Sequence, residues 1–169
     1  KFLKHGQNKE ALIRFLFEQW CTYTSIMFSG IVVYVCHDEK CHRLQPGLGN
    51  EPNNFQEIAM LSCDHEEADT RMLLHANHAS QSHRSIVIKS PDTDVFIIML
   101  SFCDILQGDL FFETGLKEKT RIIDVRCVQQ QIGEKESKAL IGFHAYTGKQ
   151  QLGRRNYRNV IRVMYSRYM

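Results

Sequence analysis

Hydrophobic and polar positions repeat with different periods along the chain, and each change of period predicts a new element. Apolar side chains recur at helical spacing over residues 8–28 and predict a helix there. Residues 31–36 are a run of β-branched and other apolar residues, which is typical of a buried strand. Pro, Gly and Asn are frequent in residues 44–54, which predicts a loop, and residues 55–63 then form a short strand.

The second half of the chain alternates between strands and helices. Helical spacing of apolar residues predicts a helix over residues 66–79, and a short apolar strand follows over 85–90. After an apolar helix that ends near Cys103, two β-rich runs flank Gly115 and predict a hairpin of residues 109–114 and 119–125. Two more helices are predicted up to Gly133 and Gly148.

This alternation predicts an α/β fold with a largely parallel sheet, helices on both of its faces and a β-hairpin insertion. The 169 residues suit one domain with an appendage, and we expect the domain over residues 1–148. Since 43% of the residues are hydrophobic and 24% are charged, the composition is that of an ordinary globular protein. No apolar run is long enough to span a membrane, so no membrane association is expected.

Charge is distributed unevenly between this domain and the last residues. Residues 149–169 contain six basic residues and no acidic one, so their formal charge is +6 and that of residues 1–148 is −4. Such a basic tail can contact nucleic-acid phosphates, and its candidate contacts are Arg154, Arg155 and Arg158. The alternative is a plain solvated end, disordered or helical.

Two acidic pairs lie at the starts of predicted helices. Glu67 and Asp69 open the helix of residues 66–79, and Asp92 and Asp94 follow the strand of residues 85–90. Carboxylates that converge repel one another unless a cation neutralises them, and Mg²⁺ is commonly held by carboxylates and water. Capping of helices by acidic residues is the competing interpretation, although it explains one acid per helix start better than two.

A further acid, Asp38, follows the strand predicted over residues 31–36. In open parallel sheets, sites form beyond the carboxyl ends of the strands. Asp38 and the Asp92–Asp94 pair are both expected there, which favours a shared metal site.

The acidic motifs carry a resemblance to a known family. Glu67-Ala68-Asp69, the strand after it and Asp92-Thr93-Asp94 resemble the PIN-like fold of the flap endonuclease and 5′–3′ exonuclease superfamily. Together with the segment from Gly142 to Gly148, they look like a group of uncharacterised animal proteins, some of them associated with mobile elements.

The resemblance implies roles for individual residues. Glu67, Asp69, Asp92 and Asp94 match the family's catalytic metal ligands, and Asp38 is similar to an earlier strand-end aspartate. The implied cofactor is Mg²⁺ or Mn²⁺, the implied partner is nucleic acid, and the implied chemistry is two-metal phosphodiester hydrolysis.

Two departures from the family pattern weaken the expectation of activity. Gly148 is followed by Lys149 and Gln150, where the family has Gly-x-Asp, and the family's first strand with its aspartate is absent. We therefore expect an N-terminally truncated, nuclease-like domain whose activity is weak or lost. The alternatives are a catalytically dead module that binds nucleic acid or protein, and a gene fragment without independent function.

Six scattered cysteines suit reduced thiols in the nucleus or cytoplasm better than a secreted disulfide framework. Cys36-His37 and Cys41-His42 invite comparison with a zinc site. Their spacing lacks a Cys-x-x-Cys knuckle, so buried cysteines and surface histidines are the default expectation.

Overall fold

The computed structural model describes residues 6–22, 31–45, 47, 51, 53–63 and 68–147. The described residues belong to two compact units, Lys1–Asp64 and His65–Met169. The expectation of a single domain over residues 1–148 stays a prediction.

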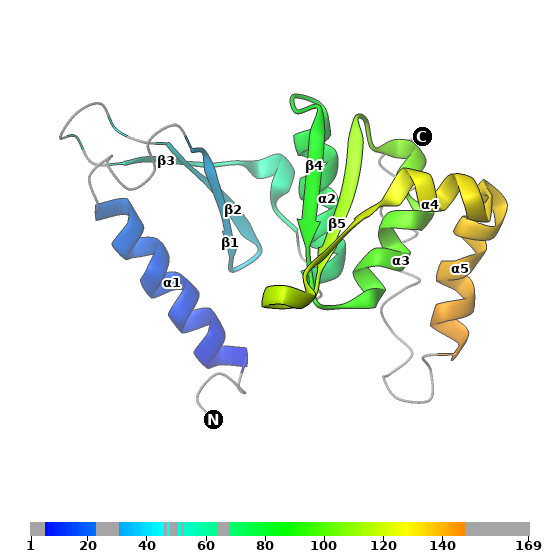
Figure 1. Ribbon diagram of the computed structural model, residues 1–169. Coiled ribbons are helices and arrows are strands. Elements are labelled where there is room, and N and C mark those ends of the chain that lie inside the picture. Colours follow the sequence, from blue (N-terminus) through cyan, green and yellow to red (C-terminus); the bar gives the residue numbers. More distant parts are fainter. Residues whose placement is uncertain are drawn as a thin grey trace. The chain divides into compact units, whose positions relative to one another are not determined.

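The first unit is one helix packed on a three-stranded antiparallel sheet (Figure 1). The helix α1 (Gly6–Thr22) is followed by β1 (Val33–His37), β2 (Lys40–Gln45), β3 (Asn54–Glu57) and the short 3₁₀ helix η3 (Ala59–Leu61). Strand β2 lies in the middle and pairs with both neighbours. Phe17 of α1 packs against Val35 and Leu44 of the sheet, and these three residues form the buried core of the unit.

A tight turn explains why residues 40–45 form a strand, β2, where the sequence predicted none. Asp38 and Glu39 have φ angles of 48° and 64°, which is the backbone of a two-residue hairpin turn. The turn reverses the chain at once, so Lys40 to Gln45 pair with β1. Leu44 and Gln45 are consequently strand residues, and the loop predicted from residue 44 was wrong at its start.

The described part of the second unit contains four α-helices, two short 3₁₀ helices and a three-stranded mixed sheet. Its regular elements, in chain order, are α2 (Ala68–Ser80), β4 (Ser85–Lys89), α3 (Thr93–Ser101), η4 (Cys103–Ile105), β5 (Asp109–Thr114), η5 (Lys117–Lys119), β6 (Arg121–Asp124), α4 (Val125–Ile132) and α5 (Glu134–Thr147). Strand β5 lies in the middle, parallel to β4 and antiparallel to β6. The predicted hairpin of residues 109–114 and 119–125 is therefore confirmed.

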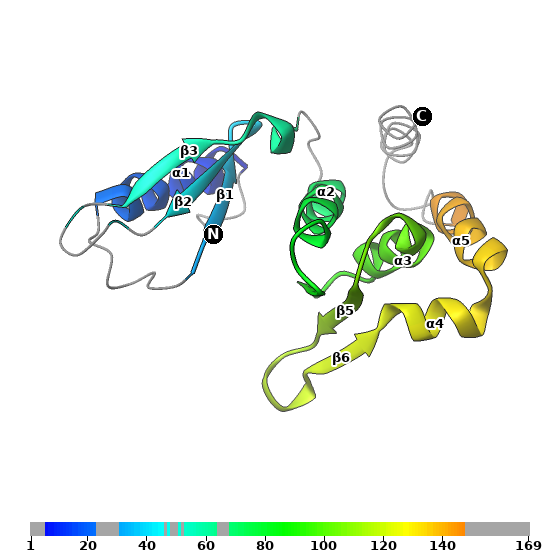
Figure 2. The ribbon, with the colours of Figure 1, turned by 90° about the horizontal axis from the view of Figure 1, so that it is seen from above.

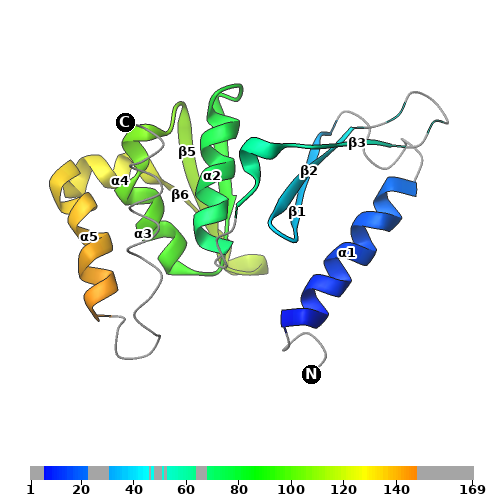
Figure 3. The ribbon, with the colours of Figure 1, turned by 180° about the vertical axis from the view of Figure 1, so that it is seen from behind.

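The core of the second unit lies on one face of this sheet. Alternate strand residues, including Ile88 and Phe112, point into a cluster formed with Leu73 of α2 and Ile98 of α3. Figures 2 and 3 show α2 and α3 beside the strands that they cover. Val87, which points to the opposite face, is 55% exposed.

The mixed α/β class is thus observed, but the predicted sheet architecture is not. Among the described residues, β4 and β5 are the one parallel pair of strands, and the helices do not flank a large sheet on both faces. The apolar run at residues 31–36 misled the prediction, because its composition suits a parallel strand equally well. It forms β1, which pairs with β2 in an antiparallel hairpin.

The predicted helices agree with the structure to within a few residues. Residues 23–28 of the first predicted helix and residues 66–67 of the second lie outside the described residues. The boundary predicted at Gly133 agrees with the structure, because Gly133, with φ of 102°, ends α4 and separates it from α5. In the described part of the chain, no helix combines the length and the apolar character that crossing a bilayer requires.

Candidate metal centre

Three aspartates converge in the second unit. Asp69 lies in the first turn of α2, Asp92 is the residue that caps α3, and Asp94 lies in the first turn of α3. One carboxylate oxygen from each lies within 4.8 Å of those of the other two. Asp69 and Asp94 are half-buried and Asp92 is exposed, so the group is accessible to solvent on one side.

Short-range hydrogen bonds fix the turn that carries two of these residues. The buried Ser90 follows β4, and its Oγ accepts a hydrogen bond of 3.1 Å from the backbone N–H of Asp92. Asp92 Oδ1 in turn accepts one of 3.0 Å from the backbone N–H of Asp94. These two bonds hold Asp92 and Asp94 at the beginning of α3 and leave the second oxygen of Asp92 outside the cap.

Two helix N-termini and a histidine lie close to this group. The N-termini of α2 and α3 both point toward carboxylates, which their dipoles stabilise. His144 of α5 also reaches the group, and its Nε2 lies 2.9 Å from Asp94 Oδ1. By contrast, the nearby cation Lys89 is 2.5 Å from Glu113 on β5 and is engaged there.

His144 is the residue at this site that sequence reasoning did not select. It lies in the segment from Gly142 to Gly148 that contributed to the family resemblance, but no spacing rule assigned it a role. Only the packing of α5 against α3 brings it to Asp94. That packing joins residues fifty positions apart, which local pattern cannot predict.

Capping alone accounts for only part of the group. Asp124 also caps a helix, α4, but it accepts its 2.9 Å hydrogen bond from the backbone N–H of Cys127, three residues on, whereas Asp92 bonds to the N–H two residues on. Among the described residues, however, Asp124 belongs to no group of three potential ligands. Asp69 and Asp94 lie in the first turns of their helices, where the dipole favours acidic residues, and with Asp92 they form a group of three potential ligands.

Four other predicted site residues are not described. Glu67, Arg154, Arg155 and Arg158 lie outside the described residues. Their roles, as a metal ligand and as nucleic-acid contacts, stay predictions.

Asp38 does not follow a strand of the sheet that carries Asp92 and Asp94. It lies in the β1–β2 turn of the first unit, whose sheet is separate from that of β4. The expectation of one shared parallel sheet edge was therefore wrong, because β1 leads into a hairpin and not into a helix.

The contacts of Asp38 are structural ones. Its Oδ2 accepts a 2.5 Å hydrogen bond from Arg14 Nη2, and its backbone N–H donates one of 2.8 Å to Glu10 Oε1. Burial on its own would raise the pKa of Asp38, but the hydrogen bonds from Arg14 and His37 outweigh it and lower the pKa. One ligand atom each of Glu10, His37 and Asp38 lies within 4.8 Å of the others, and Arg14 supplies the compensating charge.

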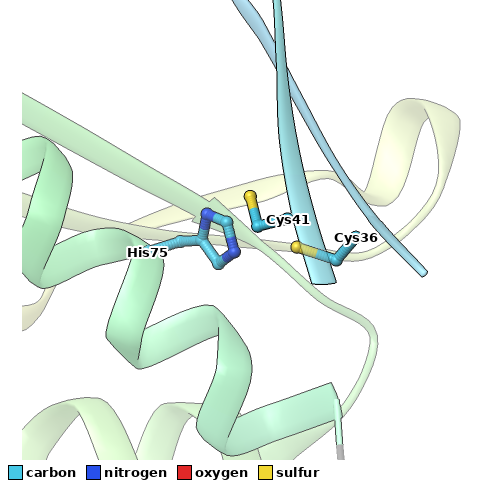
Figure 4. Close-up of side chains that lie close together, drawn as sticks. All are labelled: Cys36, Cys41 and His75. Atoms are coloured by element: carbon cyan, nitrogen blue, oxygen red, sulfur yellow. The ribbon is translucent and has the colours of Figure 1, made fainter. Parts of the chain in front are cut away.

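The zinc interpretation of the cysteine–histidine segment gains no support within the first unit. Cys36 and Cys41 face each other on β1 and β2 (Figure 4), while His37 and His42 point to the opposite face and stack near Phe17. Two thiols are fewer than the three or four protein ligands of a zinc site. His75, which Figure 4 also draws, belongs to α2 of the second unit.

Comparison of the chain with protein-family models, with curated proteins and with solved structures finds no match.

Proposed function

We propose that Asp69, Asp92 and Asp94 bind a divalent metal ion and that the second unit is a nuclease-like module of the PIN-like, flap-endonuclease type. The observation that carries the proposal is the convergence of three carboxylates from two helix starts within 4.8 Å. Hard oxygen donors of this kind suit Mg²⁺ or Mn²⁺.

The order of elements supports the kinship with this superfamily. One acid-bearing helix start, a strand and a second acid-bearing helix start follow one another as α2, β4 and α3. This is the succession in which the family's Glu-Ala-Glu/Asp and Asp-x-Asp motifs occur. The sheet of that fold is largely parallel, whereas β4 and β5 are the parallel pair among the strands described here.

The residues around the proposed metal site would have different roles. Asp69, Asp92 and Asp94 hold the ion, and the contact of His144 Nε2 with Asp94 Oδ1 orients Asp94. Ser90 fixes the position of Asp92 through the backbone. When bound, such an ion acts as a Lewis acid toward water and a phosphodiester.

We infer that cleavage by this chain is weak or absent. The position at which the family has its Gly-x-Asp acid is occupied here by Gly148-Lys149-Gln150. Loss of even an indirect ligand contact costs roughly 10–100-fold in metal affinity or activity, and a missing direct ligand costs no less. A site with too few carboxylates favours one ion over the two that the full mechanism uses.

A nuclease assay tests the proposal with a matched pair of variants. Asp92→Asn removes a charge from the group but keeps a good helix cap, and Asp124→Asn does the same at the cap of α4. With flap and single-stranded substrates and millimolar Mn²⁺, any cleavage should disappear in Asp92→Asn and persist in Asp124→Asn. Cleavage that survives Asp92→Asn, or that needs no divalent ion, would contradict the proposed site.

The second candidate is a module that binds nucleic acid or protein without cutting. The missing acid after Gly148 favours it, and the basic residues of the tail supply phosphate contacts. Its signature is metal-independent, salt-sensitive binding of single-stranded nucleic acid without cleavage. Absence of metal binding, cleavage and nucleic-acid binding together would indicate a fragment without independent function.

A further inference from the structure

Two cysteines face each other across the hairpin of the first unit. The register of β1 and β2 places Cys36 directly opposite Cys41. Both are thiols, Cys41 fully buried and Cys36 half-buried. Figure 4 shows the two sulfur atoms on neighbouring strands, and they lie within 4.8 Å of each other.

The position of this pair in the ladder brings the side chains closer than in the adjacent pair. His37 and Lys40 close the two-residue turn and therefore form a hydrogen-bonded pair, so the next pair, Cys36 and Cys41, is a non-hydrogen-bonded one. The Cys41 carbonyl confirms this assignment, because it accepts a 2.8 Å hydrogen bond from the N–H of Ile58 after β3 and so points away from β1.

Pairs of this kind meet the geometric condition for a disulfide. Opposite Cα atoms in non-hydrogen-bonded pairs are about 4.5 Å apart, and disulfides form at Cα separations of about 4.4–6.8 Å. The register and the proximity of the sulfur atoms, which lie within 4.8 Å of each other, are compatible with this geometry.

We propose that Cys36 and Cys41 form a reversible redox pair, oxidised to a cross-strand disulfide by small-molecule disulfides such as oxidised glutathione. The Cys36 thiolate attacks the small disulfide, forms a mixed disulfide and releases one small thiol. The Cys41 thiolate then attacks the Cys36 sulfur, the protein disulfide forms and the second small thiol leaves. Two protein thiols are thereby oxidised by two electrons and one small disulfide is reduced to two thiols.

The exposure of the two residues assigns these roles. Cys36 is the half-buried member and meets the external oxidant, whereas the fully buried Cys41 reaches the mixed disulfide from within the hairpin. Cys103 of the second unit is fully buried, and burial raises the pKa of its thiol. Cys127 is exposed, so it should accept a small thiol without closing a bridge.

The bridge would act on the contact between the hairpin and α1. It would restrict the conformation of the turn at Asp38 and Glu39. Because Asp38 bonds to Arg14 and Glu10 of α1, the same restriction would stabilise the packing of α1 on the hairpin. Oxidation should therefore stabilise the first unit, and reduction should reverse the effect. This inference is independent of the proposed metal centre.

Mapping of the disulfides after oxidation tests the proposal on the full chain. The protein, kept in EDTA, is incubated with excess oxidised glutathione, quenched with acid, alkylated and digested with trypsin. Because trypsin cleaves after Lys40, a Cys36–Cys41 bridge joins two peptides. The peptide with Cys36 also contains Cys21, so the same experiment on Cys21→Ser removes the ambiguity.

We expect a Cys36–Cys41 bridge in wild type and in Cys21→Ser, with glutathione on Cys127. In Cys41→Ser, Cys36 should instead retain glutathione, which traps the intermediate. The proposal is overturned if both cysteines are alkylated while Cys127 is fully modified, or if Cys36 carries glutathione in wild type and Cys41 is alkylated. Fragmentation of the bridged wild-type peptide by tandem mass spectrometry also distinguishes Cys21 from Cys36, so the wild-type result decides the question even if a variant folds poorly.

Discussion

Two buried serines at the contact between α3 and α5 should respond in opposite ways to the same substitution. Ser101 Oγ lies 2.9 Å from the carbonyl oxygens of Ile97 and Ser137 and donates its hydrogen there. Ser137 is fully buried, and its Oγ has no hydrogen-bond partner among the described residues. One hydroxyl is therefore satisfied and the other is not.

The expected changes in the free energy of unfolding follow from whether each hydroxyl has a hydrogen-bond partner. A buried polar group without a partner costs about 1–3 kcal/mol, so Ser137→Ala should raise the free energy of unfolding by roughly that amount. A typical satisfied hydrogen bond contributes about 1 kcal/mol, so Ser101→Ala should lower it by about 1 kcal/mol or slightly less. The better helix propensity of Ala adds at most about 0.5 kcal/mol to each variant and does not change either sign.

Urea unfolding followed by far-ultraviolet circular dichroism measures both effects. Fluorescence is less suitable, because the single tryptophan, Trp20, lies in α1 of the first unit, whereas both serines belong to the second unit. A change of midpoint at constant slope would show a change of stability. If Ser137→Ala destabilises the protein by 1 kcal/mol or more, its hydroxyl has a partner and the reasoning fails.

Three further predictions concern single positions. Gly108→Ala should destabilise the second unit by about 2 kcal/mol or more, seen as a lower melting temperature, because φ is +75° and a Cβ would lie 2.2 Å from the Arg84 carbonyl oxygen. The pKa of Asp38 is lowered on folding, so the Asp38 carboxylate stabilises the folded protein above about pH 4, and this stabilisation is lost as the pH falls through the folded pKa. Arg14→Gln should therefore weaken the dependence of stability on pH in this acidic range, as measured by acid unfolding. Burial, with the neighbouring His37, lowers the pKa of His42, so stability should decrease as the pH falls below about 6.5, and His42→Phe should reduce that decrease in pH-dependent melting.

Sequence reasoning succeeded where the signal is local. The hairpin around Gly115 and the helix boundary at Gly133 carry glycines with φ of 94° and 102°, conformations that other residues rarely adopt. Acidic residues at helix starts likewise mark α2 and α3, and three of them converge as the residue pattern suggested.

The errors arose where strand pairing is not encoded in composition. The β-branched run of β1 fits a parallel or an antiparallel neighbour equally well, and the two positive φ angles of Asp38 and Glu39 decide for the hairpin. Neither residue is a glycine, so the turn gave no strong signal. The contact of His144 with Asp94 was missed for a related reason, since it depends on how α5 packs against α3.

The proposed binding of a metal ion by Asp69, Asp92 and Asp94 is tested most directly by calorimetric titration of the full chain with Mn²⁺. The wild-type protein and Asp124→Asn should bind with the same affinity, whereas Asp92→Asn and Asp94→Asn should bind at least about tenfold more weakly, because each loses a direct ligand. Absence of binding in wild type at millimolar Mn²⁺, or equal affinity in all four proteins, would contradict the account.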